Sequence, residues 1–204
     1  MRELSYDSLV NRRPQFFLRP LKITDAQSIY QHIKNREVRK YLLGVPNTYR
    51  LKDAVNFIRD VKKKEKMGTA YTFGIVLNDT RLVIGVISLE KIDKRHKNCE
   101  LGCWLGRKYW NQGIMSEAVR RILKFAFEKL KMHRVSARVI AGNTGSVRVL
   151  ENNNFRLEGV LFEAVYKNRY WHNLVLYGIL KDDYQKYFLD SNQDDLYNNK
   201  NSNV

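Results

Sequence analysis

The most regular hydrophobic pattern in the chain starts at Ile114 and forms one broad apolar stripe. Apolar residues recur every four positions in two adjacent rows, as expected for one face of an α-helix. The rows are Ile114, Ala118, Ile122, Ala126 and Leu130, and Met115, Val119, Leu123 and Phe127. Ser116 and Glu117 fall in the first predicted turn, where side-chain oxygens and negative charge suit the positive end of the helix dipole. Gly113 therefore lies where a loop becomes a helix.

The remaining periodicities predict further helices and strands. A capping box of Thr24 and Gln27 predicts a helix that runs through about Asn35. The other predicted elements are a strand (15–21), a short helical piece (37–42), a helix (50–66), three consecutive antiparallel strands (70–78, 81–93 and 98–106), a strand (133–142), a short helix (143–155) and a β-hairpin (155–180) with Lys167-Asn168 at or beside its turn. The helix from Ile114 joins two strands, which places Gly113 at the carboxyl end of a strand, where open sheets bind ligands.

Nothing in the sequence divides the chain into separate domains. With 204 residues and 44% hydrophobic content it can bury one core, and it contains no internal repeat and no long linker. We therefore expect an N-terminal extension (1–15), one domain (16–189) and a disordered tail (190–204) rich in Asn, Asp and Ser. We find neither an apolar run of membrane-spanning length nor a signal sequence, which predicts a cytoplasmic protein without a membrane partner.

The chain carries a large positive charge. Its formal net charge is +16 at pH 7, and its pI is about 9.9. This charge favours acidic partners such as nucleic acid, phosphate-rich cofactors or ribosomal surfaces, and it disfavours polycationic substrates. Because the basic residues are spread over several predicted elements, most of them are expected on solvated faces.

Two cysteines, Cys99 and Cys103, lie in one predicted strand. Residues four apart in a strand share a face but are too distant to form a disulfide, so both thiols are expected to be reduced. With His96 they would make half of a zinc site, but the sequence offers no second pair of ligands. We therefore predict that the protein holds no metal.

Gly113 is the first candidate for ligand binding. A residue without a side chain allows a ligand to approach the backbone closely, and the first N–H groups of the helix that follows have no helical acceptors. Together these features favour an anion such as a phosphate group. The alternative is that Gly113 only shapes the turn.

Three sequence blocks resemble the GNAT superfamily of acetyl-CoA-dependent N-acetyltransferases. They are the loop and helix start YWNQGIMSEA, the segment NTGSVRVLE and the strand YWHNLVLY. The resemblance extends over about 16–184, and within the superfamily the chain looks like the RimJ/RimL-like branch, which acts on the N-termini of ribosomal proteins. It implies a GNAT fold of the α/β (α+β) class, with a mixed, mostly antiparallel sheet of about seven strands flanked by about four helices.

The resemblance also implies which residues bind acetyl-CoA. The superfamily loop has a central glycine, here Gly113, and its backbone N–H groups hold the coenzyme A pyrophosphate. Met115 departs from the general pattern, and its side chain is expected to point into the core. An N–H group of Trp104 or Leu105 would bind the pantetheine or the thioester oxygen, and the Asn143 side chain would bind the pantetheine arm and cap a helix. The implied cofactor-binding residues are Trp104, Leu105, Asn111, Gln112, Gly113, Ile114, Met115, Ser116 and Asn143.

Two catalytic residues are implied by their positions. Glu100 stands where several relatives carry a catalytic glutamate that accepts the amine proton; alternatively, it is a surface residue of an alternating strand. Many relatives protonate the thiolate with a tyrosine, whose position here is Leu150, whereas Ser146 matches a serine proposed for this role in RimL-like relatives. The glutamate proposed as base in those relatives corresponds to Val165. Glu163, two residues earlier and expected on the same strand face, is a candidate replacement.

The resemblance implies a protein N-terminal amine as acceptor, acetyl-CoA as co-substrate and association with the ribosome. One alternative acceptor is a small amine such as a polyamine, amino sugar or drug. Another alternative is a protein that binds CoA without catalysis, since Leu150 and Val165 stand where some relatives have an acid and a base. The charge alone raises a nucleic-acid-binding protein as a further alternative, although the sequence contains no recognised nucleic-acid module. We expect a monomer or a homodimer.

Overall fold

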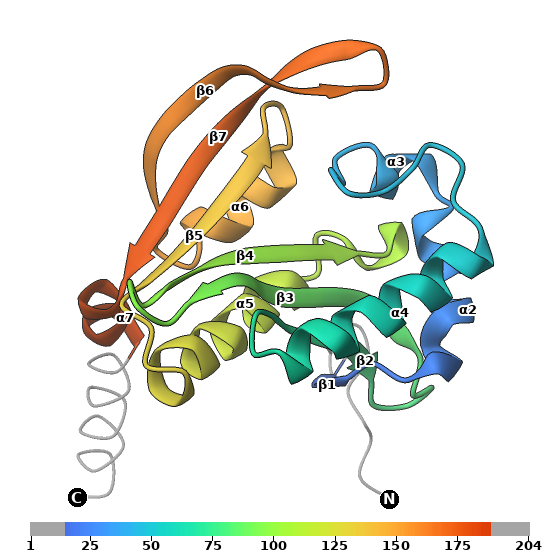
Figure 1. The fold of residues 1–204 in the computed structure, drawn as a ribbon, viewed down its shortest axis with the longest axis horizontal. Helices are drawn as coiled ribbons and strands as arrows, with labels where there is room; N and C mark the ends of the chain where they lie inside the picture. The colour runs from blue at the N-terminus through green and yellow to red at the C-terminus, as the bar shows by residue number, and fades with distance from the viewer. Residues whose placement is uncertain (1–14, 189–204) are drawn as a thin grey trace, which may run out of the picture. The chain divides into compact units, whose positions relative to one another are not determined.

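The computed structural model of the chain describes residues 15–188 (Figure 1). The predicted extension, apart from Gln15, and the predicted tail lie outside the described residues. Seven strands form one sheet with the order β1-β2-β3-β4-β5-β7-β6. They are β1 (Phe16–Pro20), β2 (Tyr71–Leu77), β3 (Val83–Asp93), β4 (Asn98–Leu105), β5 (Arg134–Ile140), β6 (Arg156–Lys167) and β7 (Tyr170–Leu180). The β4–β5 pair is parallel, whereas β1–β2, β5–β7 and β6–β7 are antiparallel, which confirms a mixed, mostly antiparallel sheet.

Six α-helices occur among the described residues. They are α2 (Ala26–Ile33), α3 (Arg36–Arg39), α4 (Leu51–Lys66), α5 (Ile114–Lys124), α6 (Thr144–Glu151) and α7 (Lys181–Phe188). Two 3₁₀ turns, η1 (Ile23–Asp25) and η2 (Arg107–Tyr109), and a π-helical turn, η3 (Phe125–Lys129), complete them. The predicted order of elements is confirmed up to β7, and α7 follows as an element that the sequence pattern did not predict.

The described residues form two compact units. Unit 1 contains residues 15–88 together with Gly102–Val119, and unit 2 contains Leu89–Leu101 together with residues 120–188. The chain passes from one unit to the other within β3, β4 and α5.

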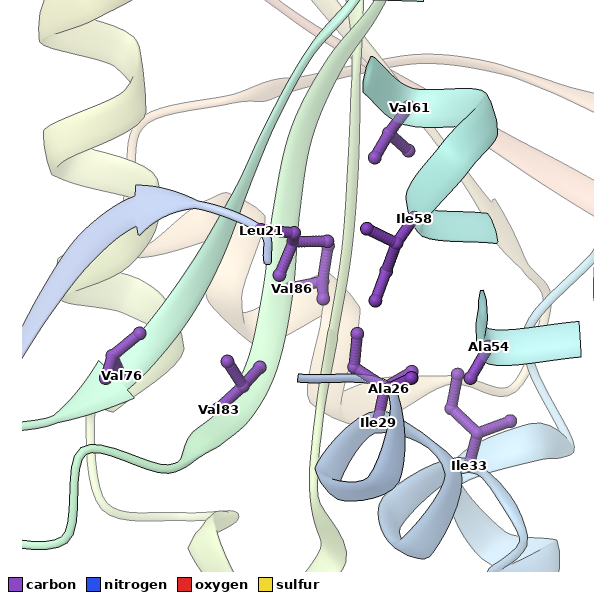
Figure 2. Packing of buried hydrophobic residues seen from close by; sticks show 10 residues of the cluster. All are labelled: Leu21, Ala26, Ile29, Ile33, Ala54, Ile58, Val61, Val76, Val83 and Val86. Carbon is purple, nitrogen blue, oxygen red and sulfur yellow. The ribbon is translucent and has the colours of Figure 1, made fainter. Parts of the chain in front are cut away.

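The core of unit 1 is formed by one hydrophobic cluster (Figure 2). Its members come from α2, α4, β2, β3 and the residue that follows β1: Leu21, Ala26, Ile29, Ile33, Ala54, Ile58, Val61, Val76, Val83 and Val86. Ile29 and Ile58 have no exposed surface, and full burial of such a side chain stabilises the fold by about 1.5–3 kcal/mol. The cluster fixes α2 and α4 on the strands of this unit.

The start of α2 differs from the prediction. The capping box of Thr24 and Gln27 is wrong, because the helical segment already begins in η1 and Asp25 is the residue that anchors it. The Asp25 carboxylate accepts hydrogen bonds from the Lys22 N–H group at 2.7 Å and from the Arg19 guanidinium at 2.7 and 2.8 Å. Burial alone would raise the pKa of Asp25, but these hydrogen bonds outweigh it, and the pKa is lowered.

The β6–β7 hairpin belongs to unit 2 and contains two irregularities. Its turn residues, Asn168 and Arg169, both have positive φ angles (53° and 70°), as in the turns that match the twist of a two-stranded ribbon. Lys167-Asn168 therefore lies at the turn, as predicted. The pairing register shifts between Leu157 and Gly159 and again between Leu161 and Val165.

Candidate active site

The loop before α5, in unit 1, has the backbone conformation of an anion site. Gly113 has a φ angle of +75° and Asn111 one of +59°, so the chain turns sharply just before the helix begins at Ile114. The Glu117 N–H group bonds to the Gly113 carbonyl at 3.1 Å. This is the first hydrogen bond of an eleven-residue helix, so the N–H groups of Ile114, Met115 and Ser116 have no helical acceptor. They present the donors that a pyrophosphate requires, and the turn keeps a side chain away from them.

The first two side chains of α5 are buried. Ile114 is 2% exposed and Met115 is 8% exposed, which confirms that Met115 packs into the core. The Gln112 side chain donates a hydrogen bond to the Lys108 carbonyl at 2.9 Å and so ties the loop to η2. Ser116 is half-buried in the first helical turn. The whole of the predicted cofactor loop, from Asn111 to Ser116, thus lies within unit 1.

The carboxyl end of β4 lies in the same unit. The Gly106 N–H group donates to the Ile84 carbonyl of β3 at 2.8 Å. Because successive N–H groups of a strand point to opposite edges, the Leu105 N–H group points away from β3, whereas that of Trp104 points toward it. The Trp104 side chain packs against the hydrophobic cluster of unit 1. This geometry favours Leu105 over Trp104 as the donor to a bound thioester.

Glu100, the predicted base, lies in unit 2 and is engaged by two cations. Its Oε2 atom is 2.8 Å from Lys91 Nζ, and its Oε1 atom is 3.0 Å from Arg138 Nε. The side chain is 21% exposed, so it is not a freely solvated surface glutamate. Each carboxylate oxygen accepts one charge-assisted hydrogen bond and keeps a second lone pair, so a proton transferred to Glu100 would neutralise the charge that both cations contact.

Asn143 and Ser146 lie together at the start of α6, in unit 2. The Asn143 side-chain oxygen accepts a hydrogen bond from the Ser146 N–H group at 3.2 Å, which confirms the predicted helix cap. Ser146 is half-buried, whereas Leu150, one turn later, is 3% exposed and belongs to the core. The position that carries a tyrosine in many relatives is therefore a packing position here.

The prediction that Glu163 and Val165 share a strand face assumed a regular strand, and the strand is irregular between them. The register shift between Leu161 and Val165 interrupts the alternation of side chains, and Glu163 itself has a φ angle of +44°. Its N–H group bonds to the Asn173 side-chain oxygen at 2.8 Å, and its own side chain is exposed. A spacing of two residues consequently says nothing about the direction of Glu163.

Other predicted chemistry concerns the cysteines and a metal. Cys99 and Cys103 are both free thiols, and burial raises the pKa of each to about 12. Burial therefore disfavours the reactive thiolate form of both. Within residues 15–188, His, Cys, Asp and Glu side chains form no group suited to hold a metal ion.

Sequence reasoning did not single out His32, which lies in α2 of unit 1. This half-buried side chain contacts the rings of Trp104 and Tyr109, next to the carboxyl end of β4. No motif surrounds it in the sequence, and only the packing of α2 reveals its position.

A glycine turn before an eleven-residue helix, at the end of a strand of a mixed sheet, is typical of proteins that bind a phosphate-bearing ligand. The chain belongs to the GNAT acetyltransferase family, since the family's acetyltransferase (GNAT) domain matches residues 15–156. It is an N-acetyltransferase, and acetyl-CoA is its co-substrate.

Named relatives agree with this assignment. An uncharacterised N-acetyltransferase, p20, of Bacillus licheniformis is 30% identical over 82% of this chain and 93% of its own length. The ribosomal-protein-serine acetyltransferase of Escherichia coli is 26% identical over 79% of this chain and 97% of its own length. The solved structure of RimL, a ribosomal L7/L12 α-N-protein acetyltransferase in complex with coenzyme A, has the same fold, with a TM-score of 0.75 at 21% identity over 81% of this chain and 94% of its own. No described helix is both long and apolar enough to span a bilayer.

Proposed function

We propose that the protein acetylates the N-terminal α-amine of a protein, with a ribosomal protein as the favoured acceptor. The observation that carries this proposal is the similarity to the ribosomal-protein-serine acetyltransferase of Escherichia coli along 97% of that enzyme. The net charge of +16 supports it, because an N-terminal amine brings one positive charge to the site and a polyamine brings several.

Most of the predicted cofactor-binding residues have a role in this proposal. Bound acetyl-CoA supplies an acetyl group activated as a thioester. The N–H groups from Gln112 to Ser116 hold the pyrophosphate, with help from the positive end of the α5 dipole. The Leu105 N–H group donates to the thioester oxygen and stabilises the negative charge that develops there. Asn143 caps α6 and binds the pantetheine arm.

Proton transfers complete the reaction. The amine nitrogen bonds to the acetyl carbonyl carbon, and the carbon–sulfur bond breaks. The Ser146 hydroxyl donates a proton to the departing sulfur and recovers one from solvent. Glu100 is the family-based candidate for the opposite transfer, although a proton on it would neutralise the charge that pairs with Lys91 and Arg138.

The proposal is tested with a free-thiol assay on matched acceptors. One peptide begins with a free serine or alanine, and its partner has the same sequence with a blocked N-terminus and an internal lysine retained. Spermidine and an amino sugar complete the panel. We expect turnover of the free peptide, with the acetyl group located on its N-terminus by mass spectrometry. Turnover of only the blocked peptide or only the small amines would refute the proposed acceptor.

A calorimetric titration with CoA accompanies the assay. Binding in the micromolar range with no turnover of any amine would instead support a protein that binds the cofactor without catalysis.

A further inference from the structure

His32 occupies a space beside β4 that a missing side chain creates. Its ring centroid is 6.4 Å from that of Trp104 and 5.8 Å from that of Tyr109, which it meets edge-on. A Cβ atom at Gly106 would stand 2.5 Å from His32 Nδ1, which is too close for two non-bonded atoms. Glycine at position 106 therefore allows the imidazole to lie directly on the end of the strand.

The imidazole lies against the two residues that flank Leu105, whose N–H group we assign to the thioester oxygen. Side chains of residues two apart share a strand face, so Trp104 and Gly106 both face His32. Leu105 lies between them and presents its N–H group at the edge away from β3. The separation along the strand between Gly106 and Leu105 is one residue, or about 3.3 Å.

The surroundings keep the imidazole neutral. Burial lowers the pKa of His32, and the nearby positive charge of Lys108 lowers it further. The titratable groups that face the ring are Lys108 and Tyr109, both from η2, whereas Trp104 and Gly106 of the β4 end carry no charge. Neither ring nitrogen has a hydrogen-bond partner in the part of the chain that the structure describes. A neutral imidazole with a free lone pair is the form that a general base requires.

We propose that His32 is the general base that accepts the proton of the acceptor amine, directly or through one water molecule. The role rests on the proposed function, since it requires an amine that attacks a thioester held by Leu105. It also provides a base that, unlike Glu100, is not engaged in ion pairs.

The proton balance is complete without a further reactant. A neutral amine forms one bond to the carbonyl carbon and transfers one proton to the lone pair of an imidazole nitrogen. The carbon–sulfur bond breaks, and the sulfur receives one proton from Ser146 or water. The imidazolium returns its proton to solvent before the next turnover.

The test compares three single variants. His32→Gln keeps a hydrogen-bonding side chain but does not titrate, and we expect it to lower kcat at least ~10²-fold, within the usual range for a general base. The affinity for CoA should stay within about threefold of wild type. The control, His96→Gln, changes an exposed histidine between β3 and β4 and should alter neither quantity. A large loss in Glu100→Gln together with wild-type turnover in His32→Gln would overturn the proposal.

A pH profile separates a base from a packing residue. In the wild type, kcat/KM should rise through a pKa below 6.5, since only neutral His32 accepts a proton, and rise again near pH 8 as the α-amine of the peptide is deprotonated. His32→Gln should lose the lower rise and keep the upper one. In His32→Ala, added imidazole should restore part of the rate. A lower rise that persists in His32→Gln would overturn the assignment.

The experiment also distinguishes a failure of the His32 proposal from a failure of the proposed acceptor. If the wild type acetylates spermidine and no peptide, the acceptor is wrong, and the same variants are measured on spermidine. If it acetylates no amine, the His32 Cε1–H signal of the wild type is followed by NMR as acetyl-CoA is added. We expect the signal to shift and to titrate below pH 6.5. A signal that does not move on binding, or a pKa at or above 6.5, overturns the proposal.

Discussion

Substitution of Gly113 tests the cofactor loop most directly. The φ angle of +75° lies in the left-handed region, where a residue with a Cβ atom costs about 1–2 kcal/mol. If the free loop relaxes, binding must restore the strained turn, and each 1.4 kcal/mol weakens binding about tenfold. Gly113→Ala should therefore raise the Kd for CoA by about 5–30-fold. Gly113→Val adds a branched side chain beside the pyrophosphate donors and should raise it more than ~100-fold.

The matched control is Gly68, which follows α4 and has a φ angle of +66°. Gly68→Ala introduces a similar backbone strain in the same unit, outside the α5 loop. We expect it to lower the free energy of unfolding by about 1–2 kcal/mol without changing the Kd for CoA. Calorimetry measures binding, and circular dichroism verifies that each variant is folded. A folded Gly113→Val that binds CoA within threefold of wild type would show that Gly113 only shapes the turn.

Two further predictions concern Ser146 and Asp25. Ser146→Ala should lower kcat about 10–10³-fold and leave the Kd for CoA within a few-fold of wild type. If this variant turns over at the wild-type rate while chemistry is rate-limiting, water and not Ser146 protonates the thiolate. Asp25→Ala should lower the free energy of unfolding in urea by about 1–3 kcal/mol, because Arg19 and the Lys22 N–H group lose their acceptor. Since folding lowers the pKa of Asp25, its stabilisation is present above the ordinary carboxyl pKa and is lost as pH falls through the lower folded value. Asp25→Ala should lose that part of the acid sensitivity, and an unchanged acid transition would contradict the account.

Elements with a strong local period were predictable from the sequence. The stripe that begins at Ile114 identified α5, and all of its residues except the half-buried Leu130 are buried in the structure: Ile114, Met115, Ala118, Val119, Ile122, Leu123, Ala126 and Phe127. The period is visible because every turn of this helix contributes to a buried face. The three strands before it were equally clear, since their apolar runs are bounded by turn residues.

Elements held by tertiary contacts were not predictable in this way. In α7, Tyr184 is 3% exposed; its ring lies 5.0 Å from that of Phe127, and its hydroxyl donates to Glu128 at 2.9 Å. These partners are more than fifty residues away in sequence, so the local pattern of α7 contains little sign of a helix. The anchor of α2 was missed for a different reason: Asp25 bonds to Arg19, only six residues earlier, but the spacing of Thr24 and Gln27 matched a capping box that the structure does not form.

The same distinction explains which parts of the candidate site the sequence could predict. Gly113 was predictable because a turn with a φ angle of +75° favours glycine, and a glycine just before a helix can be recognised in the sequence. His32 was not, because a histidine in a helix has no local mark of function and acquires its neighbours only when α2 packs beside β4. Gly106 was informative only in retrospect: its missing side chain makes room for an imidazole that is 74 residues earlier in the chain. Backbone-held ligands thus leave a sequence signal, whereas a base placed by packing is found from the structure.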